Sequence, residues 1–373
     1  MTLPANDGDV LAADLASFAE VIRRTSERWW PLASVPAECE RDGGPDDTRL
    51  WQALVEAGAT ALGLADALGG AGTGIFGAAA VIAAAARTLQ PGGLLATTGL
   101  AAPVLNALVG TSGEDPAREL GARIAAGARA TAVVAPHLTL SPAGTVRGVV
   151  TSVLDAPASE IVLLILGTGP ATSIVAADAA CITEKTPVRA LDPTRGYGDL
   201  SLDLGRDHLK VLLADDTAAT AAAQAVAQMG LAVAADSVGG AENAVQAAVD
   251  YARVREQFGR PIGSFQALRH LIVDTHVCVQ QAAAAVRHAA RTSAWDSHIA
   301  QVDVHVAKAL ATDAYIRAAS TCVQVHGGIG FTAELPPHLH VKRARGNEAL
   351  LGNARWHRAR IGELLREQVP DEW

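Results

Sequence analysis

The chain has 373 residues and a formal net charge of −9, and half of its residues are hydrophobic although only 4% are aromatic. This composition predicts several packed layers or subdomains with cores of Ala, Val, Leu and Ile. The acidic balance, with a pI near 5.6, argues against a nucleic-acid-binding protein, because neutralising phosphates requires a basic surface.

Local patterns argue against three further classes of protein. The four cysteines lie far apart and form no CxxC pair, so neither a zinc site nor a disulfide framework is expected. Residues 1–9 are polar and acidic, unlike a signal peptide. The longest apolar run, residues 75–86, is too short to cross a bilayer. We therefore expect a cytoplasmic protein with no membrane partner.

Residues 1–128 are predicted to form an N-terminal helical domain. Gly-rich turns, such as Gly69–Gly74 and Pro91–Gly93, separate its helices, and segments 78–87 and 117–128 are rich in helix-favouring Ala, Leu and Ile. The Gly-x-Gly-x-Gly run from Gly70 to Gly74 is no dinucleotide-binding fingerprint, because no βαβ pattern surrounds it.

Residues 129–216 are predicted to form a middle β domain. Short β-branched runs separated by Gly, Pro and Asp occupy residues 131–134, 145–151, 161–166 and 171–175, and residues 200–204 alternate with period two. Short strands at this spacing indicate a small β-barrel or sandwich.

Residues 217–373 are predicted to form a C-terminal four-helix bundle, with helices near 217–254, 264–296, 298–326 and 347–367. The whole chain is therefore expected to be mostly α with a central β domain.

The first motif of interest runs from Arg255 to Ile262, with the sequence Arg-Glu-Gln-Phe-Gly-Arg-Pro-Ile. Gly259 and Pro261 should end the preceding helix, and Ser264 could cap the next one. An arginine at such a helix break can grip a diphosphate through two hydrogen bonds. The alternative is that Arg255 forms an ion pair with a nearby acid, Glu256 or Asp250.

The second motif begins at Gln324 and contains Gly327-Gly328-Ile329-Gly330-Phe331-Thr332. Glycines let the backbone approach a ligand closely and present N–H groups to phosphate. A simple turn after a helix would explain the same glycines without any ligand.

Together the two motifs resemble the paired C-terminal motifs of the acyl-CoA dehydrogenase family of flavoproteins, whose helical–β–helical order also matches. The resemblance implies an FAD cofactor, with Arg255 on its pyrophosphate and Gln257 and Phe258 on its adenosine side. In the family's dimers, the positions of these three residues, of Gln324 and of the loop of Gly327 and Gly328 serve the flavin held by the neighbouring subunit.

The same resemblance locates two positions at which the family carries its catalytic glutamate. Most members place it in a Glu-Gly-Thr/Ser turn, where this chain has Leu351-Gly352-Asn353. A minority place it on an earlier helix, where this chain has Met229. Neither side chain can accept a proton, so no catalytic residue is predicted at either position. Glu348, one helical turn before Leu351, is the candidate for a displaced base.

Flavin-holding features of the family's middle domain are also missing. The segment Val134-Ala135-Pro136 stands where the family has Thr-Glu-Pro, and the Gly-Ser-Asp that should follow is absent. No Trp or Phe occurs between Gly77 and Gln257, so the aromatic side chain that packs against the flavin ring is missing as well.

These departures lead to a functional expectation. The chain resembles the non-catalytic subunit of heterotetrameric acyl-CoA dehydrogenases of actinobacterial steroid side-chain degradation, which implies an enzyme subunit inactive alone and an α2β2 complex with a related subunit. That partner would supply the glutamate and bind most of a bulky, steroid-derived acyl-CoA, and the two chains would share FAD. Two alternatives remain: a self-sufficient flavoenzyme, using Glu348 or acting as a flavin monooxygenase, and a non-catalytic scaffold.

A metal site is not expected. Glu334, His338 and His340 lie close in sequence, but Pro336-Pro337 interrupts them and no further ligand is suitably spaced. The two histidines are predicted to be surface or interface residues.

Overall fold

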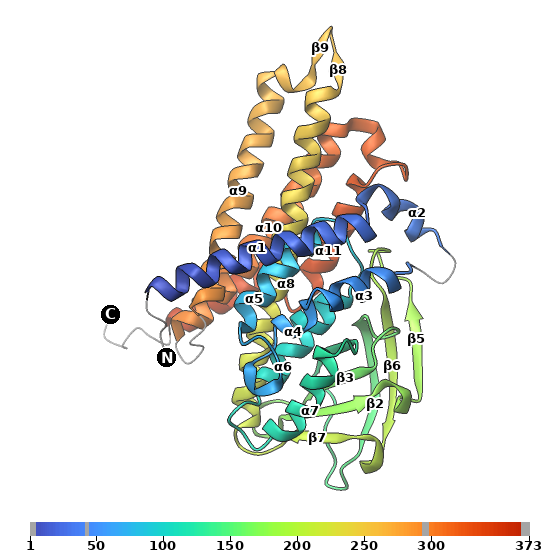
Figure 1. Ribbon diagram of the computed structural model, residues 1–373, viewed down its shortest axis with the longest axis vertical. Coiled ribbons are helices and arrows are strands. Elements are labelled where there is room, and N and C mark those ends of the chain that lie inside the picture. Colours follow the sequence, from blue (N-terminus) through green and yellow to red (C-terminus); the bar gives the residue numbers. More distant parts are fainter. Residues whose placement is uncertain (1–4, 42–44, 293–297, 367–373) are drawn as a thin grey trace.

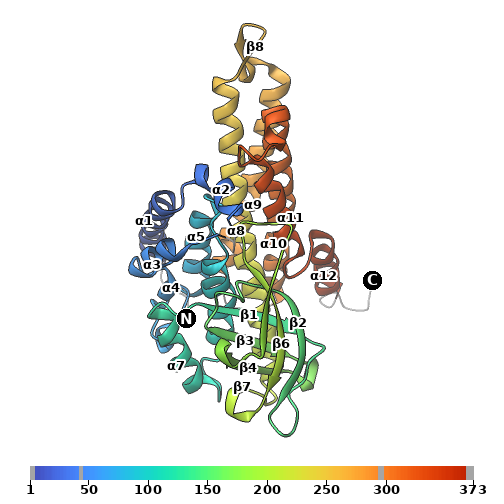
Figure 2. The same ribbon diagram turned by 90° about the vertical axis from the view of Figure 1, so that its right-hand side faces the viewer.

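A computed structural model describes residues 5–41, 45–292 and 298–366. Helical segments precede and follow a middle β region along the chain, and the strands lie together at one side of the molecule (Figure 1). The long C-terminal helices form the axis of the molecule. The N-terminal helices lie on one side of this axis, and the β region lies at its lower end in Figure 2.

The N-terminal part consists of helices, of which those at residues 74–86 and 95–106 pack on the long C-terminal helix at residues 218–254. They are α1 (Ala5–Trp29), α2 (Val35–Cys39), α3 (Thr48–Glu56), α4 (Ala59–Leu62), α5 (Gly74–Ala86), α6 (Ala102–Asn106) and α7 (Glu114–Ala125), with a π-helical segment (Leu95–Ala101) before α6.

The middle region contains two sheets, with strand orders β1-β3-β4-β7 and β2-β6-β5. The strands are β1 (Ala130–Ala135), β2 (Val146–Leu154), β3 (Ile161–Leu166), β4 (Ser173–Asp178), β5 (Glu184–Val188), β6 (Tyr197–Leu204) and β7 (Lys210–Leu213). β1 and β3 are parallel, and the other ladders are antiparallel.

Strand β3 is buried on both faces, which explains its unbroken run of apolar residues. Ile161, Leu163 and Ile165 join the core shared with the helices. The alternate residues Val162, Leu164 and Leu166 join the core between the two sheets. The first sheet therefore seats the β region against the helical parts.

Three long helices, α8 (Ala218–Val254), α9 (Gln266–Arg291) and α10 (His298–His326), form the C-terminal part with the shorter α11 (Pro337–Ala349) and α12 (Ala354–Arg366). The α8–α9 connection projects beyond the rest of the molecule at the top of Figure 1 and carries the hairpin β8 (Glu256–Gln257) and β9 (Arg260–Pro261).

The fold class is as predicted, with local corrections. The helix expected at 347–367 begins only at Ala354, because Leu351 and Gly352 adopt positive φ, and the preceding helix α11, which starts at Pro337, was not predicted. Ser264 does not cap α9: the preceding residue is Phe265, and the Ser264 hydroxyl is buried without a hydrogen-bond partner among the described residues. β5 and β7 were not anticipated, and the expected helix ends at 296 and 367 lie outside the described residues.

Helix α8 is long and apolar enough to cross a membrane by length and composition. However, 67% of its most apolar window is buried inside the protein, as in the core helix of a globular fold.

Candidate functional site

The first predicted motif forms the projecting tip of the α8–α9 connection. Helix α8 ends at Val254, and Gln257 pairs with Arg260, which leaves Phe258 and Gly259 as a two-residue turn. Both turn residues have positive φ (53° and 74°), the conformation of a type I′ hairpin turn. The turn holds Phe258 out from the protein with 90% of its surface exposed.

The structure brings the second motif next to the first. The ring of Tyr251, in the last turn of α8, stacks on His326, the last residue of α10, with centroids 4.2 Å apart. His326 Nδ1 also lies 2.8 Å from the carbonyl oxygen of Cys322. This stack places the Gly327 loop beside the helix end that carries Arg255.

Every predicted cofactor-binding residue is exposed in the isolated chain: Arg255, Gln257, Phe258, Gln324, Gly327 and Gly328. Asp250 instead lies 4.0 Å from Arg253 and accepts a hydrogen bond from Gln246. Within the described part of the chain, Arg255 has no ion-pair partner, so the ion-pair alternative is not what the structure contains.

Different structural constraints apply to the glycines of the loop at residues 327–330. Gly327 has φ +65°, which favours glycine. A Cβ at Gly330 would lie 3.0 Å from the Val323 carbonyl oxygen, so packing requires glycine there. A Cβ at Gly328 would meet nothing within 4 Å. Gly328 is thus left without an intramolecular reason and is open to an external group.

The second predicted site, around Leu351, lines a cavity of about 440 Å³ between the β region and the C-terminal helices. Val134 at the end of β1, the loop 167–172, Gly230 on α8 and Leu351 contribute to its wall. Among the described residues that line it, none is an aspartate or glutamate. The cavity therefore has no carboxylate that could remove a proton from a bound molecule.

Trp356, His305 and His357 form an aromatic wall of this cavity that the sequence analysis missed. Trp356 and His357 follow closely after Leu351, so their place in the site could have been suspected. His305, from α10, is identified only by the fold.

The two histidines form a hydrogen bond between their Nδ1 atoms, 2.7 Å apart. Burial lowers the pKa of each to about 4, so both are neutral at neutral pH. His357 Nε2 lies 3.1 Å from the Leu351 carbonyl oxygen and must donate to it. Neutral His357 then accepts at Nδ1, and His305 is the donor. Both polar edges of His357 are thus occupied within the protein.

Lys308 holds the Leu351 turn in place through hydrogen bonds to the backbone. Its Nζ donates to the carbonyl oxygens of Asn347, at 2.9 Å, and Gly352, at 3.3 Å. Burial lowers the pKa of this lysine to about 8. The turn therefore keeps a defined shape although it bears leucine.

The side chains of Met229, at the family's alternative base position, and of Glu348, the candidate for a displaced base, do not line this cavity. Met229 is 1% exposed in the hydrophobic core, while its neighbour Gly230 faces the cavity. Glu348 pairs with Arg345 at 2.8 Å and lines a separate shallow hollow with Ala349 and Asn353. Its carboxylate is engaged away from the Leu351 cavity.

A buried polar network connects the β5–β6 loop to the C-terminal helices. Arg343 of α11 contacts Asp192 at 2.5 Å, and Arg195 contacts Asp236 of α8 at 2.6 Å. Asn347 links the two helices by donating to Asp236 at 2.7 Å. Burial opposes ionisation of Asp192, but Arg343 and Arg195 outweigh it and hold its pKa below the usual range. The network fixes the helix that leads into the Leu351 turn.

One histidine prediction was wrong. His340 is neither a surface nor an interface residue: it is buried, accepts from the Tyr315 hydroxyl at 3.0 Å and donates to Asn243 at 3.0 Å. Burial lowers the pKa of His340 to about 3. Across the described ranges of the chain, no group of three or more potential metal ligands occurs.

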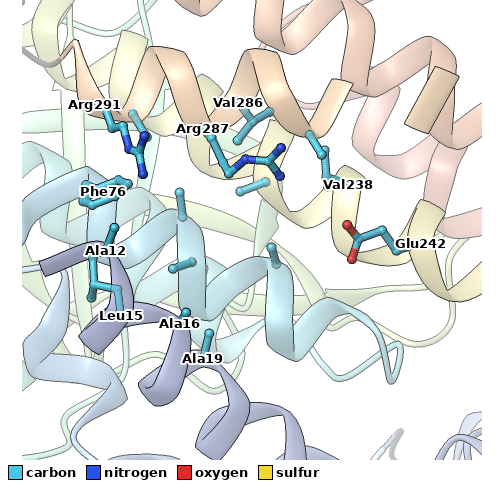
Figure 3. Close-up of a pocket in the computed structure, with 16 residues that line it drawn as sticks. Ala12, Leu15, Ala16, Ala19, Phe76, Val238, Glu242, Val286, Arg287 and Arg291 are labelled. Atoms are coloured by element: carbon cyan, nitrogen blue, oxygen red, sulfur yellow. The ribbon is translucent and has the colours of Figure 1, made fainter. Parts of the chain in front are cut away.

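A separate hollow of about 240 Å³ lies between α1, α5, α8 and α9 (Figure 3). Its walls are mostly alanine, with Arg287 and Arg291 extending from α9 at its rim (Figure 3). It contains none of the predicted site residues and no arrangement of reactive groups.

Comparison with known proteins identifies the fold. Residues 219–365 match the family described as acyl-CoA dehydrogenase, C-terminal domain. The chain is 32% identical over 347 residues to the acyl-CoA dehydrogenase IpdE2 of Mycobacterium tuberculosis, covering 91% of this chain and 92% of that protein.

Solved structures agree with this result. The structure is similar to the ChsE4-ChsE5 complex from Mycobacterium tuberculosis, with a TM-score of 0.84, 24% identity and coverage of 95% of this chain and 98% of that one. It is also similar to a variant of the Tcur3481-Tcur3483 steroid ACAD, with a TM-score of 0.83, 24% identity and coverage of 96% and 99%. The predicted helical–β–helical fold is thereby confirmed.

Proposed function

The chain belongs to the acyl-CoA dehydrogenase family, and we propose that it is the non-catalytic subunit of a heteromeric, FAD-dependent member. In this role it contacts the FAD of a related partner subunit, in an α2β2 complex of the cytoplasm. The partner supplies the catalytic glutamate and most of the acyl-CoA pocket. The likeness to a steroid ACAD supports a bulky, steroid-derived acyl-CoA as the substrate.

One distance carries the proposal. Gly230, in the wall of the Leu351 cavity, and Arg255, directly after the end of helix α8, are 25 residues apart (255 − 230). At 1.5 Å per residue they are separated by about 37 Å. An arginine side chain cannot bridge this gap, which supports a role for the tip toward a group outside its own chain.

The residues of the tip suit the diphosphate of FAD. Arg255 has a guanidinium that is exposed and, within the described residues, free of ion pairs, so it can bind phosphate oxygens without first giving up a partner. The open backbone at Gly328 allows close approach. When bound, flavin accepts a hydride from the acyl-CoA.

The chain's own cavity does not suit the chemical step. Dehydrogenation requires a carboxylate that takes a proton from the carbon next to the thioester. Leu351 offers no such group, and Glu348 is held by Arg345 in another hollow. The carboxylate must therefore come from the partner. The Glu348 alternative predicts instead that the isolated chain binds flavin and loses activity on Glu348→Gln.

The test is an Arg255→Ala variant of the complex formed with a related subunit that carries the glutamate. Loss of charge-assisted hydrogen bonds worth about 1.5–3 kcal/mol should weaken flavin binding by about 10- to 100-fold, while the subunits still assemble. Arg253→Ala is the matched control, because Arg253 lies two residues earlier and is exposed. If Arg255→Ala bound flavin with unchanged affinity, this result would contradict the proposed flavin contact and favour the scaffold alternative.

A further inference from the structure

A second cavity, of about 630 Å³, lies at the opposite end of strand β1 from the Leu351 cavity. Arg129, just before β1, lines the second cavity, whereas Val134, near the end of β1, lines the first. Five residues of strand separate them by roughly 17 Å. The second cavity is thus distinct from the proposed flavin-linked site.

The deep end of this cavity holds a buried carboxylate without a hydrogen bond. Asp155 is 4% exposed, lines the cavity, and its Oδ2 has no hydrogen-bond partner among the described residues. Arg129 Nη1 lies 3.7 Å from this oxygen, beyond hydrogen-bond distance. A buried carboxylate is costly unless its oxygens receive donors. Asp155 thus lines the cavity without receiving a hydrogen bond on Oδ2 from the described residues.

The neighbouring arginines are already engaged. Arg129 contacts Asp47 at 2.6 Å and lies over the ring of Trp51 at 4.6 Å. Arg195 contacts Asp236 and Asn347 through its two terminal nitrogens, whereas its buried Nε has no hydrogen-bond partner among the described residues. Arg189, by contrast, is exposed and forms no ion pair with any described residue. The two charged groups that remain for a ligand are Asp155 at depth and Arg189.

The walls of this cavity are rich in proline and carry a small net charge. Five prolines line the cavity: Pro45, Pro91, Pro157, Pro187 and Pro193. Each has a fixed φ, so the cavity is largely preformed. Three lining arginines against two lining aspartates leave one net positive charge (3 − 2). The volume lies within the usual range of small-molecule sites.

We propose that this cavity binds a small carboxylate that also bears a hydroxyl or ammonium group. The hydroxyl or ammonium donates to Asp155, and the carboxylate pairs with Arg189. A ligand with only a carboxylate would leave Asp155 unpaired, and one with only an amine would leave Arg189 unpaired. Burial raises the pKa of Asp155 to about 7, so the acceptor is charged above neutral pH.

The test uses four three-carbon probes with the full chain at pH 8: β-alanine, 3-hydroxypropanoate, propanoate and propylamine, each titrated by calorimetry. We expect β-alanine or 3-hydroxypropanoate to bind at least tenfold more tightly than both single-function probes. Asp155→Asn should remove this preference, and the variant should fold because Asn tolerates the φ of +57° at this position. Asp207→Asn, at an exposed position of the same region, is the control that should retain it.

Three results would overturn the proposal. If neither two-function probe bound, the cavity would hold only water. If propanoate bound as tightly as they did, or if Asp155→Asn left their binding unchanged, the site would be a simple anion site independent of Asp155. Melting curves of both variants distinguish loss of binding from loss of folding.

Discussion

Three residues of the proposed sites, Phe258, Leu351 and Asp155, hold positive φ although none is glycine (53°, 57° and 57°). A side chain in this region costs of order 1 kcal/mol, and such strain is concentrated at functional sites. At Leu351 the hydrogen bond from His357 and the contacts of Lys308 hold the turn. At Phe258 the ring is 90% exposed and meets the ring of Phe265 edge-on, with centroids 6.1 Å apart; such exposure is the pattern expected of a residue kept for a partner or ligand.

Phe258→Asn tests this interpretation. Asn suits a type I′ turn, so the free energy of unfolding of the isolated chain should stay unchanged or rise by up to about 1 kcal/mol. Flavin affinity of the complex should fall, because the aromatic contact is lost. Urea denaturation of the chain and flavin titration of the complex measure the two effects. A clear destabilisation of the chain alone would show that Phe258 has an intramolecular role.

The buried carboxyl of Asp155 should make the stability of the folded protein depend on pH. Its folded-state pKa of about 7 exceeds the ordinary 3.8, so the protonated carboxyl favours the folded protein. This stabilisation is complete below pH 4 and is lost as pH rises through 7, by at most about 4 kcal/mol. Asp155→Asn should therefore be more stable than the natural chain at pH 8, with the difference shrinking toward pH 4. Lower stability of the variant at every pH would contradict the unpaired-carboxylate geometry.

At the scale of elements, the buried pair Arg343–Asp192 joins helix α11 to the β5–β6 loop, with both side chains 1% exposed. Asp192→Asn leaves a buried guanidinium without its counter-charge and should cost about 3–5 kcal/mol in urea denaturation. The exposed pair Arg147–Asp203 is the comparison: Asp203→Asn should change stability by less than about 1 kcal/mol. Equal effects would mean that burial does not set the strength of the Arg343 pair.

Periodicity could identify the elements but not their interruptions. α8, α9 and α10 have long apolar patterns, and their predicted and observed ends differ by a few residues. The break between α11 and α12 was missed because Leu350 and Leu351 continue a helical pattern, while the turn depends on Lys308 of α10 and on His357, six residues further along the chain. β5 and β7 were missed because exposed positions dominate β5 and β7 has only four residues.

The residues of the candidate site could likewise be predicted only in part from the sequence. Arg255, Gln257 and Phe258 lie within four consecutive residues, so a motif identified them before the fold was known. The His305–His357 pair and the Asp155 cavity each join segments far apart in the chain. No local pattern encodes such contacts, because they depend on how the β region packs against the helices.

At the scale of the whole molecule, the tip and the Leu351 cavity lie far apart on one helix, so neither can complete a site alone. A dimer with a related subunit would bring this chain's tip to the partner's flavin. The account therefore predicts that the isolated chain carries no flavin of its own.

The most direct test is flavin absorbance per polypeptide, measured for the chain purified alone and after co-expression with a related subunit that has the glutamate. The account predicts no flavin in the chain alone and about one per heterodimer in the complex. Stoichiometric flavin in the isolated chain would contradict it and would favour a self-sufficient enzyme.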